Sequence, residues 1–335
     1  MLLPRGTPFV GKRYEVDDAD HGRSLVVSRR FIVASVLVAL ALIAAVTVLA
    51  RDTERARLDD AARAGAPGTF VRLGDGLTHY DLTGPDTGRT IVLLSGATVP
   101  FYLWDPTRDA LVANGFRVLR YDYFGRGFSD RPKVAYDLDT FDRQLTQLLD
   151  TLSISIAVDV AGISMGGVIA TSFADRHPER VRSLTLVDPY FGHEGATPMA
   201  LRIPGVGELA MTLSADAMAK GQLDDFLHPE RYPDWVSRYQ KQMQYEGFRR
   251  AVLATMRGDV RERPAVSFTA LAQSRIPILI LWGRADRTAP FDDSDTVRAA
   301  FPRAEFHAIE GAAHLPQIEQ ATRVDSLLLR FLRAH

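Results

Sequence analysis

The 335-residue sequence contains no cysteine. This absence excludes disulfide bonds, a thiolate nucleophile and cysteine-ligated metal sites. It leaves the compartment open, because a domain of this size can fold without covalent cross-links. An excess of positive charge is also lacking, since 40 Lys and Arg residues balance 41 Asp and Glu residues. No basic surface is therefore expected to hold a polyanion, and nucleic acid is not an expected partner.

One segment lacks charge altogether. Residues 31–50 contain no Asp, Glu, Lys or Arg, and Ser35 and Thr47 are their only polar members. As a helix this segment would be about 30 Å long, which matches the hydrocarbon thickness of a bilayer. We therefore predict a polar N-terminal leader over residues 1–30, followed by a transmembrane helix at 31–50. A buried core helix and a cleavable signal peptide are the alternatives.

The charges that flank residues 31–50 are almost balanced. Five Lys and Arg residues lie within 11–30 and four within 51–70, so the positive-inside bias is small. A short leader before a single span usually stays in the cytoplasm while the large domain crosses the membrane. The expected location is therefore the cell membrane, with one span and the C-terminal domain on the extracytoplasmic side.

Residues 51–68 are rich in charge and alanine and end in Pro-Gly, which indicates a helical stalk. From residue 69 to 335, short apolar runs alternate with helical patterns, and the first two runs flank a glycine-containing turn as in a hairpin. The later runs are nearly continuous in apolar residues, which is typical of strands buried on both faces. They are TIVLLS (90–95), FRVLRYD (116–122), IAVDVAGIS (156–164), SLTLVD (183–188), PILILWG (277–283) and AEFHAIE (304–310). We therefore predict an α/β fold with a mostly parallel central sheet and helices on both faces.

A long stretch between residues 188 and 277 interrupts this alternation. The part from about 191 to 259 has helical patterns and no convincing strand, which predicts a helical cap inserted into the α/β domain. The methionines of this stretch either form a small core within the cap or line a pliable pocket for an acyl chain. Five of the seven methionines lie here: Met199, Met211, Met218, Met243 and Met256.

A candidate nucleophile lies in the string GISMGG, residues 162–167, which follows an apolar run and precedes a helical pattern. A tight strand-to-helix turn exposes a serine on a strained backbone, and glycines around it avoid clashes between neighbouring elements. Ser164 is therefore the candidate nucleophile, and a purely structural turn is the alternative. The amide of Met165 would lie at the helix N-terminus, where free N–H groups favour developing negative charge.

A serine nucleophile needs a base, and the base needs an orienting acid. His314 lies in a loop after the last strand pattern, at the sheet edge where Ser164 is also expected. Asp286 directly follows the penultimate strand pattern and is the candidate acid, with Asp188 as the second choice. The other histidines fit the base less well, although two near or in the cap could contact substrate: His193 and His228.

These motifs, in this order, resemble the α/β-hydrolase superfamily over about residues 69–333. The resemblance implies that Ser164, Asp286 and His314 form a catalytic triad. The segments that carry it are SGATVPFYLWD (95–105), RYDYFGRGFSDRP (120–132), GISMGG (162–167), LWGRADRTAP (281–290) and GAAHLPQIEQ (311–320).

The same resemblance places the oxyanion hole at the amides of Ala97 and Met165. The family usually has a histidine before the glycine that precedes the first of these amides, and this sequence has Ser95 there. The serine at position 95 should leave the Ala97 amide unaffected. No cofactor or metal is expected, because the glycines after Asp122 do not complete a dinucleotide motif, with Asp130 at the last glycine position, and no H-E-x-x-H occurs.

The resemblance therefore implies a serine hydrolase that cleaves carboxylic esters. The expected membrane anchor and the methionine-rich cap favour lipophilic acyl esters such as acylglycerols as substrates. One alternative is a hydrolase of carbon-carbon bonds (meta-cleavage products) or amides with the same triad. The carbon-carbon hydrolases commonly carry Asn before the serine and Trp after the histidine, where this sequence has Ile163 and Leu315. A binding protein on the same fold is the other alternative, and the complete triad argues against it.

Overall fold

The structure is a computed structural model that describes residue 11 and residues 29–190, 197–258, 260, 268, 271 and 274–335. The chain divides into two compact units, Met1–Thr47 and Val48–His335. Most of the expected leader lies outside the described residues, and so does His193.

Helix α1, Arg29–Arg51, covers the uncharged segment. Its described apolar side chains are exposed, including Leu42, Ile43 and Val46, and the Thr47 hydroxyl donates to the Ile43 carbonyl oxygen (2.8 Å). Taking the residues that the structure describes, no helix combines the length and the hydropathy needed to cross a membrane. The transmembrane helix expected at 31–50 therefore has no support from the structure.

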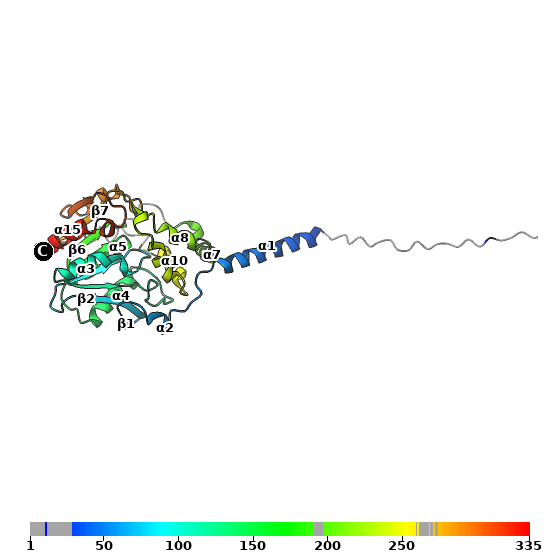
Figure 1. Ribbon diagram of the computed structural model, residues 1–335, viewed down its shortest axis with the longest axis horizontal. Helices are drawn as coiled ribbons and strands as arrows, with labels where there is room; N and C mark the ends of the chain where they lie inside the picture. The colour runs from blue at the N-terminus through cyan, green and yellow to red at the C-terminus, as the bar shows by residue number, and fades with distance from the viewer. Residues whose placement is uncertain are drawn as a thin grey trace, which may run out of the picture. The chain divides into compact units, whose positions relative to one another are not determined.

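The second unit is built on an eight-stranded sheet of order β1-β2-β4-β3-β5-β6-β7-β8 (Figure 1). Strands β1 and β2 form the predicted hairpin, β2 pairs with β4 antiparallel, and the other neighbouring strands are parallel. The predicted α/β fold with a mostly parallel sheet is confirmed. The strands are β1 (Thr69–Leu73), β2 (Gly76–Thr83), β3 (Thr90–Leu94), β4 (Arg117–Tyr121), β5 (Val158–Ile163), β6 (Val181–Val187), β7 (Ile278–Gly283) and β8 (Glu305–Ile309).

Successive side chains of the central strands enter two different apolar cores, because side chains alternate across a strand. In β3, Val92 and Leu94 belong to one core, while Ile91 and Leu93 belong to the other. Helices α4 (Leu138–Thr151), α5 (Met165–Arg176) and α13 (Asp293–Ala300) contribute to the first core. Helices α3 (Asp105–Ala113) and α15 (Ala321–Ala334) contribute to the second. Burial of both faces explains the continuous apolar runs of the sequence.

Between β6 and β7 the described residues form helices rather than strands. These helices are α6 (Met199–Arg202), α7 (Val206–Leu213), α8 (Ala215–Gly221), α9 (Trp235–Met243) and α10 (Phe248–Arg257). Most of their buried side chains continue the second core, which includes Met211, Trp235 and Phe248, while Ala251 of α10 belongs to the first. We call residues 197–258 the cap.

Residues 52–63, which belong to the segment expected as a helical stalk, are helical only at α2, Asp60–Arg63. We call this segment the strap, because it is bonded along the cap. Glu54 accepts hydrogen bonds from the amides of Gly247 and Arg249, and Asp52 forms an ion pair with Arg249 (2.6 Å). These tertiary bonds to the cap override the helix propensity of an alanine-rich segment.

The last short elements complete the second unit. Helix α14, Pro316–Glu319, precedes α15, and its Glu319 accepts hydrogen bonds from the amides of Ala313, Leu227 and His228. One carboxylate therefore holds the loop after β8 against the cap. Three 3₁₀ turns lie at Phe101–Trp104, Pro178–Arg180 and Pro229–Arg231.

Candidate active site

Ser164 lies at the turn between β5 and α5, in a backbone conformation that residues other than glycine rarely adopt (φ 54°, ψ −123°). Its amide donates to the Val187 carbonyl oxygen of β6 (3.0 Å), and its carbonyl oxygen accepts from the Gly167 amide (2.9 Å). These bonds hold the turn, so the strain persists. The serine is thereby presented at the carboxyl edge of the sheet and directly before the N-terminus of α5.

Two glycines allow this turn because other backbone passes against them. A Cβ atom at Gly162 would lie 2.2 Å from the carbonyl oxygen of Gly166. One at Gly166 would lie 2.4 Å from the carbonyl oxygens of both Leu94 and Ser95. Any larger residue at either glycine would therefore push α5 away from the strands β5 and β3. Neither glycine has a positive φ, so it is packing and not backbone conformation that requires them.

The loop after β3 approaches the serine from the other side. A Cβ atom at Gly96 would lie 3.7 Å from the Cβ atom of Ser164, and Ala97 and Met165 both line the same cavity as Ser164. The structure thus brings together the two residues expected to form the oxyanion hole. The Ser95 carbonyl oxygen accepts from the Tyr123 hydroxyl (3.0 Å). The Ser95 hydroxyl is buried without a hydrogen-bond partner among the described residues.

A buried arginine holds the loop of Ala97. Arg126 is fully buried, and its Nε donates to the Ala97 carbonyl oxygen (2.8 Å), while its Nη2 donates to the Thr255 hydroxyl of α10 (2.8 Å). Its remaining hydrogen bond goes to the Phe124 carbonyl oxygen, so within the described chain every acceptor is neutral. Burial lowers the pKa of Arg126 to about 10, with the charge of Tyr136 opposing the change.

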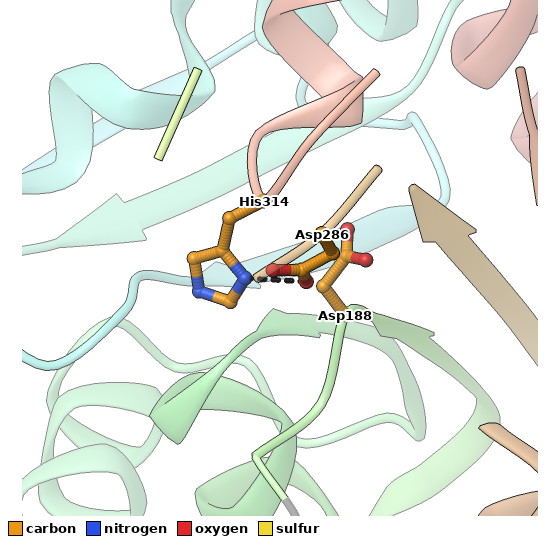
Figure 2. A group of neighbouring side chains, drawn as sticks. All are labelled: Asp188, Asp286 and His314. Atoms are coloured by element: carbon orange, nitrogen blue, oxygen red, sulfur yellow. Dashed lines mark hydrogen bonds and ion pairs between the residues drawn. The ribbon is translucent and has the colours of Figure 1, made fainter. Parts of the chain in front are cut away.

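His314 and Asp286 form a hydrogen-bonded pair. Asp286 follows β7 and His314 follows β8, and His314 Nδ1 lies 2.7 Å from Asp286 Oδ2 (Figure 2). Asp286 Oδ1 accepts from the amides of Thr288 (2.8 Å) and Ala289 (2.9 Å). The loop after β7 therefore fixes the acid, the acid fixes the imidazole, and Nε2 is left to face a reacting group.

The second-choice acid, Asp188, lies beside this pair. It follows β6, its side chain is fully buried, and one oxygen of each aspartate and one nitrogen of His314 lie within 4.8 Å of one another. In the view of Figure 2 the Asp286 carboxyl group lies between the His314 ring and the Asp188 carboxyl group. His314 Nδ1 is hydrogen-bonded to Asp286 and not to Asp188, so the geometry favours Asp286 as the orienting acid.

Among the described residues, the ligand atoms of Asp188, Asp286 and His314 lie close enough together to hold a metal ion. Two ligands of a tetrahedral zinc ion stand about 3.3 Å apart, given bonds near 2.0 Å. His314 Nδ1 and Asp286 Oδ2 are closer than that, at 2.7 Å. Their spacing is that of a hydrogen bond, and the cluster is better described as a proton-sharing group.

The serine and the histidine lie at neighbouring positions of the same sheet edge. Ser164 bonds to Val187, the neighbour of Asp188, and Asp188 lies within 4.8 Å of the Asp286 and His314 donor atoms. Among the hydrogen bonds of the described residues, none joins the Ser164 hydroxyl to the His314 ring. Such bonds are often long in ligand-free enzymes and tighten when substrate binds. Ser164, Asp286 and His314 are therefore at one sheet edge, and their catalytic roles stay a prediction.

Ser164 opens into a cavity of about 380 Å³. Its lining mixes apolar side chains with polar ones, the buried Asp293 among them. It also has one exposed arginine, Arg287, which forms no ion pair or hydrogen bond through its side chain among the described residues. The sequence analysis missed Arg287, although its place directly after Asp286 puts it at the same edge. The lining residues are Ala97, Ser164, Met165, Tyr190, Met256, Val260, Arg287, Thr288, Ala289, Pro290 and Asp293.

A larger cavity, of about 510 Å³, does not contain Ser164. Its lining includes His79 and Asp122, which form a buried pair (2.7 Å), and Arg238 and Lys241 of α9. No serine lines it within the described chain. Volume is therefore a poor guide to the reacting site here, and the chemistry points to the smaller cavity.

The cap side chains divide between the two expected roles. Met256 lines the Ser164 cavity, whereas Met211 and Met243 are buried in the second core and Met199 is exposed. Most of the described methionines therefore serve packing. His228, expected near substrate, interacts with Glu230 (3.3 Å) and is absent from the described lining of the Ser164 cavity.

The raised pKa of His314, the candidate base, predicts that activity rises with pH. Burial alone would lower the pKa of His314, but the charge and hydrogen bond of Asp286, with the charge of Asp225, outweigh it and raise the pKa to about 9. A protonated imidazole cannot accept the serine proton. We therefore expect kcat/KM for a neutral substrate to rise with pH along a limb above the ordinary value of 6.5, measured from pH 6 to 10. A limb at or below 6.5 would contradict this.

Comparison with known proteins places these features in a wider group. The sequence profile of the alpha/beta hydrolase fold matches residues 89–321. The chain is 27% identical to the AB hydrolase superfamily protein YisY of Bacillus subtilis, over 73% of this chain and 91% of that protein. It is 32% identical to 2-hydroxymuconate semialdehyde hydrolase of a Pseudomonas species, over 73% and 87%. A thermophilic esterase from Thermogutta terrifontis has the same fold, with a TM-score of 0.67, 23% identity, and coverage of 80% and 99%.

Proposed function

Since the chain belongs to the alpha/beta hydrolase fold family, we propose that it is a serine hydrolase that cleaves carboxylic esters. The observation that carries the proposal is Ser164 on its strained turn, at the edge that also holds the bonded pair of His314 and Asp286. Ala97 and Met165 beside it in one cavity add the two amides that acyl transfer needs.

The proposed reaction has two halves. His314 Nε2 takes the Ser164 proton while Ser164 Oγ attacks the ester carbonyl carbon, and the amides of Ala97 and Met165 stabilise the oxyanion. The histidine then gives its proton to the leaving alcohol, and the acyl-serine forms. In the second half water attacks the acyl group with the same base, which releases the acid and restores Ser164. Asp286 holds the imidazole in the orientation for both transfers.

A carbon-carbon hydrolase is the second candidate. It is supported by the 2-hydroxymuconate semialdehyde hydrolase at 32% identity and by a 2-hydroxy-6-oxononadienedioate/2-hydroxy-6-oxononatrienedioate hydrolase of Burkholderia vietnamiensis at 31% identity. The second name describes a dicarboxylate, and the Ser164 cavity contains a cation, Arg287. Ile163 and Leu315, which stand where carbon-carbon hydrolases commonly have Asn and Trp, favour the ester reading.

A substrate panel separates the two reactions. The purified full chain is assayed at equal concentration on a series of neutral p-nitrophenyl esters and on a dienedioate of the carbon-carbon type. We expect the larger kcat/KM on an ester. A larger kcat/KM on the dienedioate would replace ester cleavage with carbon-carbon cleavage, and the same triad would serve it.

Arg287 is expected to select charge in the substrate. Changing Arg287→Glu should lower kcat/KM about tenfold for an ester that carries a free carboxylate, because an attraction becomes a repulsion at a solvent-accessible site. A neutral ester of the same length should respond little. Arg287→Lys, which keeps the charge, is the matched control. Equal losses on both esters would show that Arg287 shapes the cavity without reading charge.

We also propose that the substrates are lipophilic acyl esters. We propose further that residues 31–50 attach the chain to the cell membrane, with the hydrolase domain outside the cytoplasm. Support comes from the uncharged sequence of this segment, the exposed apolar side chains of α1, and the apolar residues Met256, Val260 and Pro290 in the cavity. The full chain should stay with membranes after alkaline carbonate washing, and a chain without residues 1–50 should not. Acylglycerol micelles hydrolysed no faster than short soluble esters would rule out the lipid preference.

A further inference from the structure

Asp188 carries a buried oxygen without a donor. Its backbone is in the left-handed region (φ 41°), and its Oδ1 accepts from the Gly283 amide (2.7 Å). Its Oδ2 is buried and has no hydrogen-bond partner among the described residues. A carboxylate in this position would leave one charged oxygen without solvent or donor, which is costly. A protonated Oδ2 would itself become a donor.

The acceptor for such a donor is next to it. Asp286 is stabilised as a carboxylate by three donors, namely His314 Nδ1 and the amides of Thr288 and Ala289. Asp188 has a single donor, the Gly283 amide. When two carboxyl groups share one buried site, both cannot readily ionise, and the proton stays on the group that is less well supported as an anion. In Figure 2 the two carboxyl groups lie side by side, as their atoms within 4.8 Å require.

We propose that Asp188 is a positioning residue: held as a neutral carboxylic acid, it donates its Oδ2–H to the carboxylate of Asp286. This bond orients Asp286 toward His314 and withdraws part of its charge. It also keeps a second negative charge away from the base. The proposal rests on the proposed serine hydrolase function and deepens it, because it assigns the protonation state of a fourth residue beside the triad.

The groups that face Asp188 agree with this assignment. Burial, and then the negative charge of Asp286, raise the pKa of Asp188 well above its ordinary value; the charge of Asp225 adds to this, and the Gly283 amide opposes it. The negative charges that raise the pKa of His314 are those of Asp286 and Asp225. An ionised Asp188 would add a third negative charge and raise the pKa of His314 further, so the free base would form only at a still higher pH.

The pH dependence of kcat/KM tests the donor role. Asp188→Ala removes the donor, so the Asp286 charge acts fully on His314 and the acid limb should move up by about one pH unit. Asp188→Asn offers an amide N–H in place of the O–H, and its limb should lie closer to wild type than that of Asp188→Ala. Asp225→Asn is the matched control, because it removes a charge that raises the pKa of His314 and should move the limb down. If both Asp188 variants move the limb down as Asp225→Asn does, Asp188 is ionised and the proposal fails.

Two readouts do not depend on activity. Infrared spectra at pH 7 should show the carbonyl band of a protonated carboxyl group in wild type and not in Asp188→Asn. The folded state holds this proton above the unfolded pKa of 3.8, so its stabilising contribution is lost as pH rises through the folded-state pKa. The difference in Tm between Asp188→Asn and wild type should therefore shift in favour of the variant from pH 4 to pH 8. The absence of the band and a constant Tm difference would overturn the proposal. The band together with a wild type that hydrolyses nothing would instead refute the proposed function.

Discussion

Changing Ser164→Ala is expected to lower kcat by roughly 10⁴- to 10⁶-fold and to abolish labelling by a fluorophosphonate probe. Removing the nucleophile of a serine triad costs about that much, and the remaining rate comes from binding and the oxyanion hole. Labelling of the purified chain, followed by mass spectrometry of the modified peptide, identifies the serine. The strained turn at φ 54° accommodates alanine as it does serine, so the fold should survive.

The matched control for this change is Ser326→Ala. Ser326 lies on the exposed side of α15, where its hydroxyl bonds only to the Thr322 carbonyl oxygen. That variant should label and turn over as wild type does. Undiminished labelling of Ser164→Ala would show that the probe reacts at another residue and would remove the proposed role of Ser164. No labelling of either protein would leave a binding protein on this fold.

Changing Asp286→Asn is expected to lower kcat about 10⁴-fold. The Asn oxygen can still accept from the amides of Thr288 and Ala289, but its amide nitrogen would face His314 Nδ1 and demand an acceptor there. The imidazole would then carry its proton on Nε2, which must accept the serine proton. The loss is measured as single-turnover acylation with a chromogenic ester.

Asp295→Asn provides the control for Asp286→Asn, since Asp295 is exposed on α13 and pairs only with Arg298 (3.1 Å). It should change kcat little. Asp188→Asn supplies the sharper comparison, because it neutralises the second-choice acid. A loss from Asp188→Asn as large as that from Asp286→Asn would mean that Asp188 is the orienting acid instead.

The strand pattern could be predicted from the sequence because each central strand is buried on both faces. Residues 90–94 form β3 as expected, with Ile91 and Leu93 facing one core and Val92 and Leu94 the other. Ser164, Asp286 and His314 could be placed at one edge because parallel strands all end there. That His314 bonds to Asp286 and not to Asp188 depends on the conformations of the loops, which no strand pattern encodes.

The strap shows where local propensity fails. Residues 51–66 contain good helix formers, yet Asp52, Glu54 and Ala56 all bond to the cap, and outside the last turn of α1 only Asp60–Arg63 of these residues are helical. Helix propensity is worth well under 1 kcal/mol per residue, so a few tertiary hydrogen bonds and an ion pair decide the outcome. A sequence pattern contains no sign of the partners, because they lie almost 200 positions away.

Charged residues that serve the site were the hardest to foresee. Arg126 was part of a recognised motif, but nothing in that motif indicates a buried guanidinium with only neutral acceptors. An arginine amid glycine and aromatic residues was the available signal. Arg287 was signalled only by its position after Asp286. Both depend on how loops from different strands meet.

Hydrogen bonds make the cap and the chemistry inseparable. From α9, Gln242 donates to the Thr98 carbonyl oxygen, and from α10, Thr255 accepts from the arginine that holds the Ala97 carbonyl oxygen. The two peptide carbonyls that follow the candidate oxyanion amide are thus anchored, directly or through one side chain, in the cap. The cap of another family member could therefore not be exchanged as a module. A chimera that kept Arg126 but lost its cap partner would leave a buried cation half-satisfied and the oxyanion loop untied.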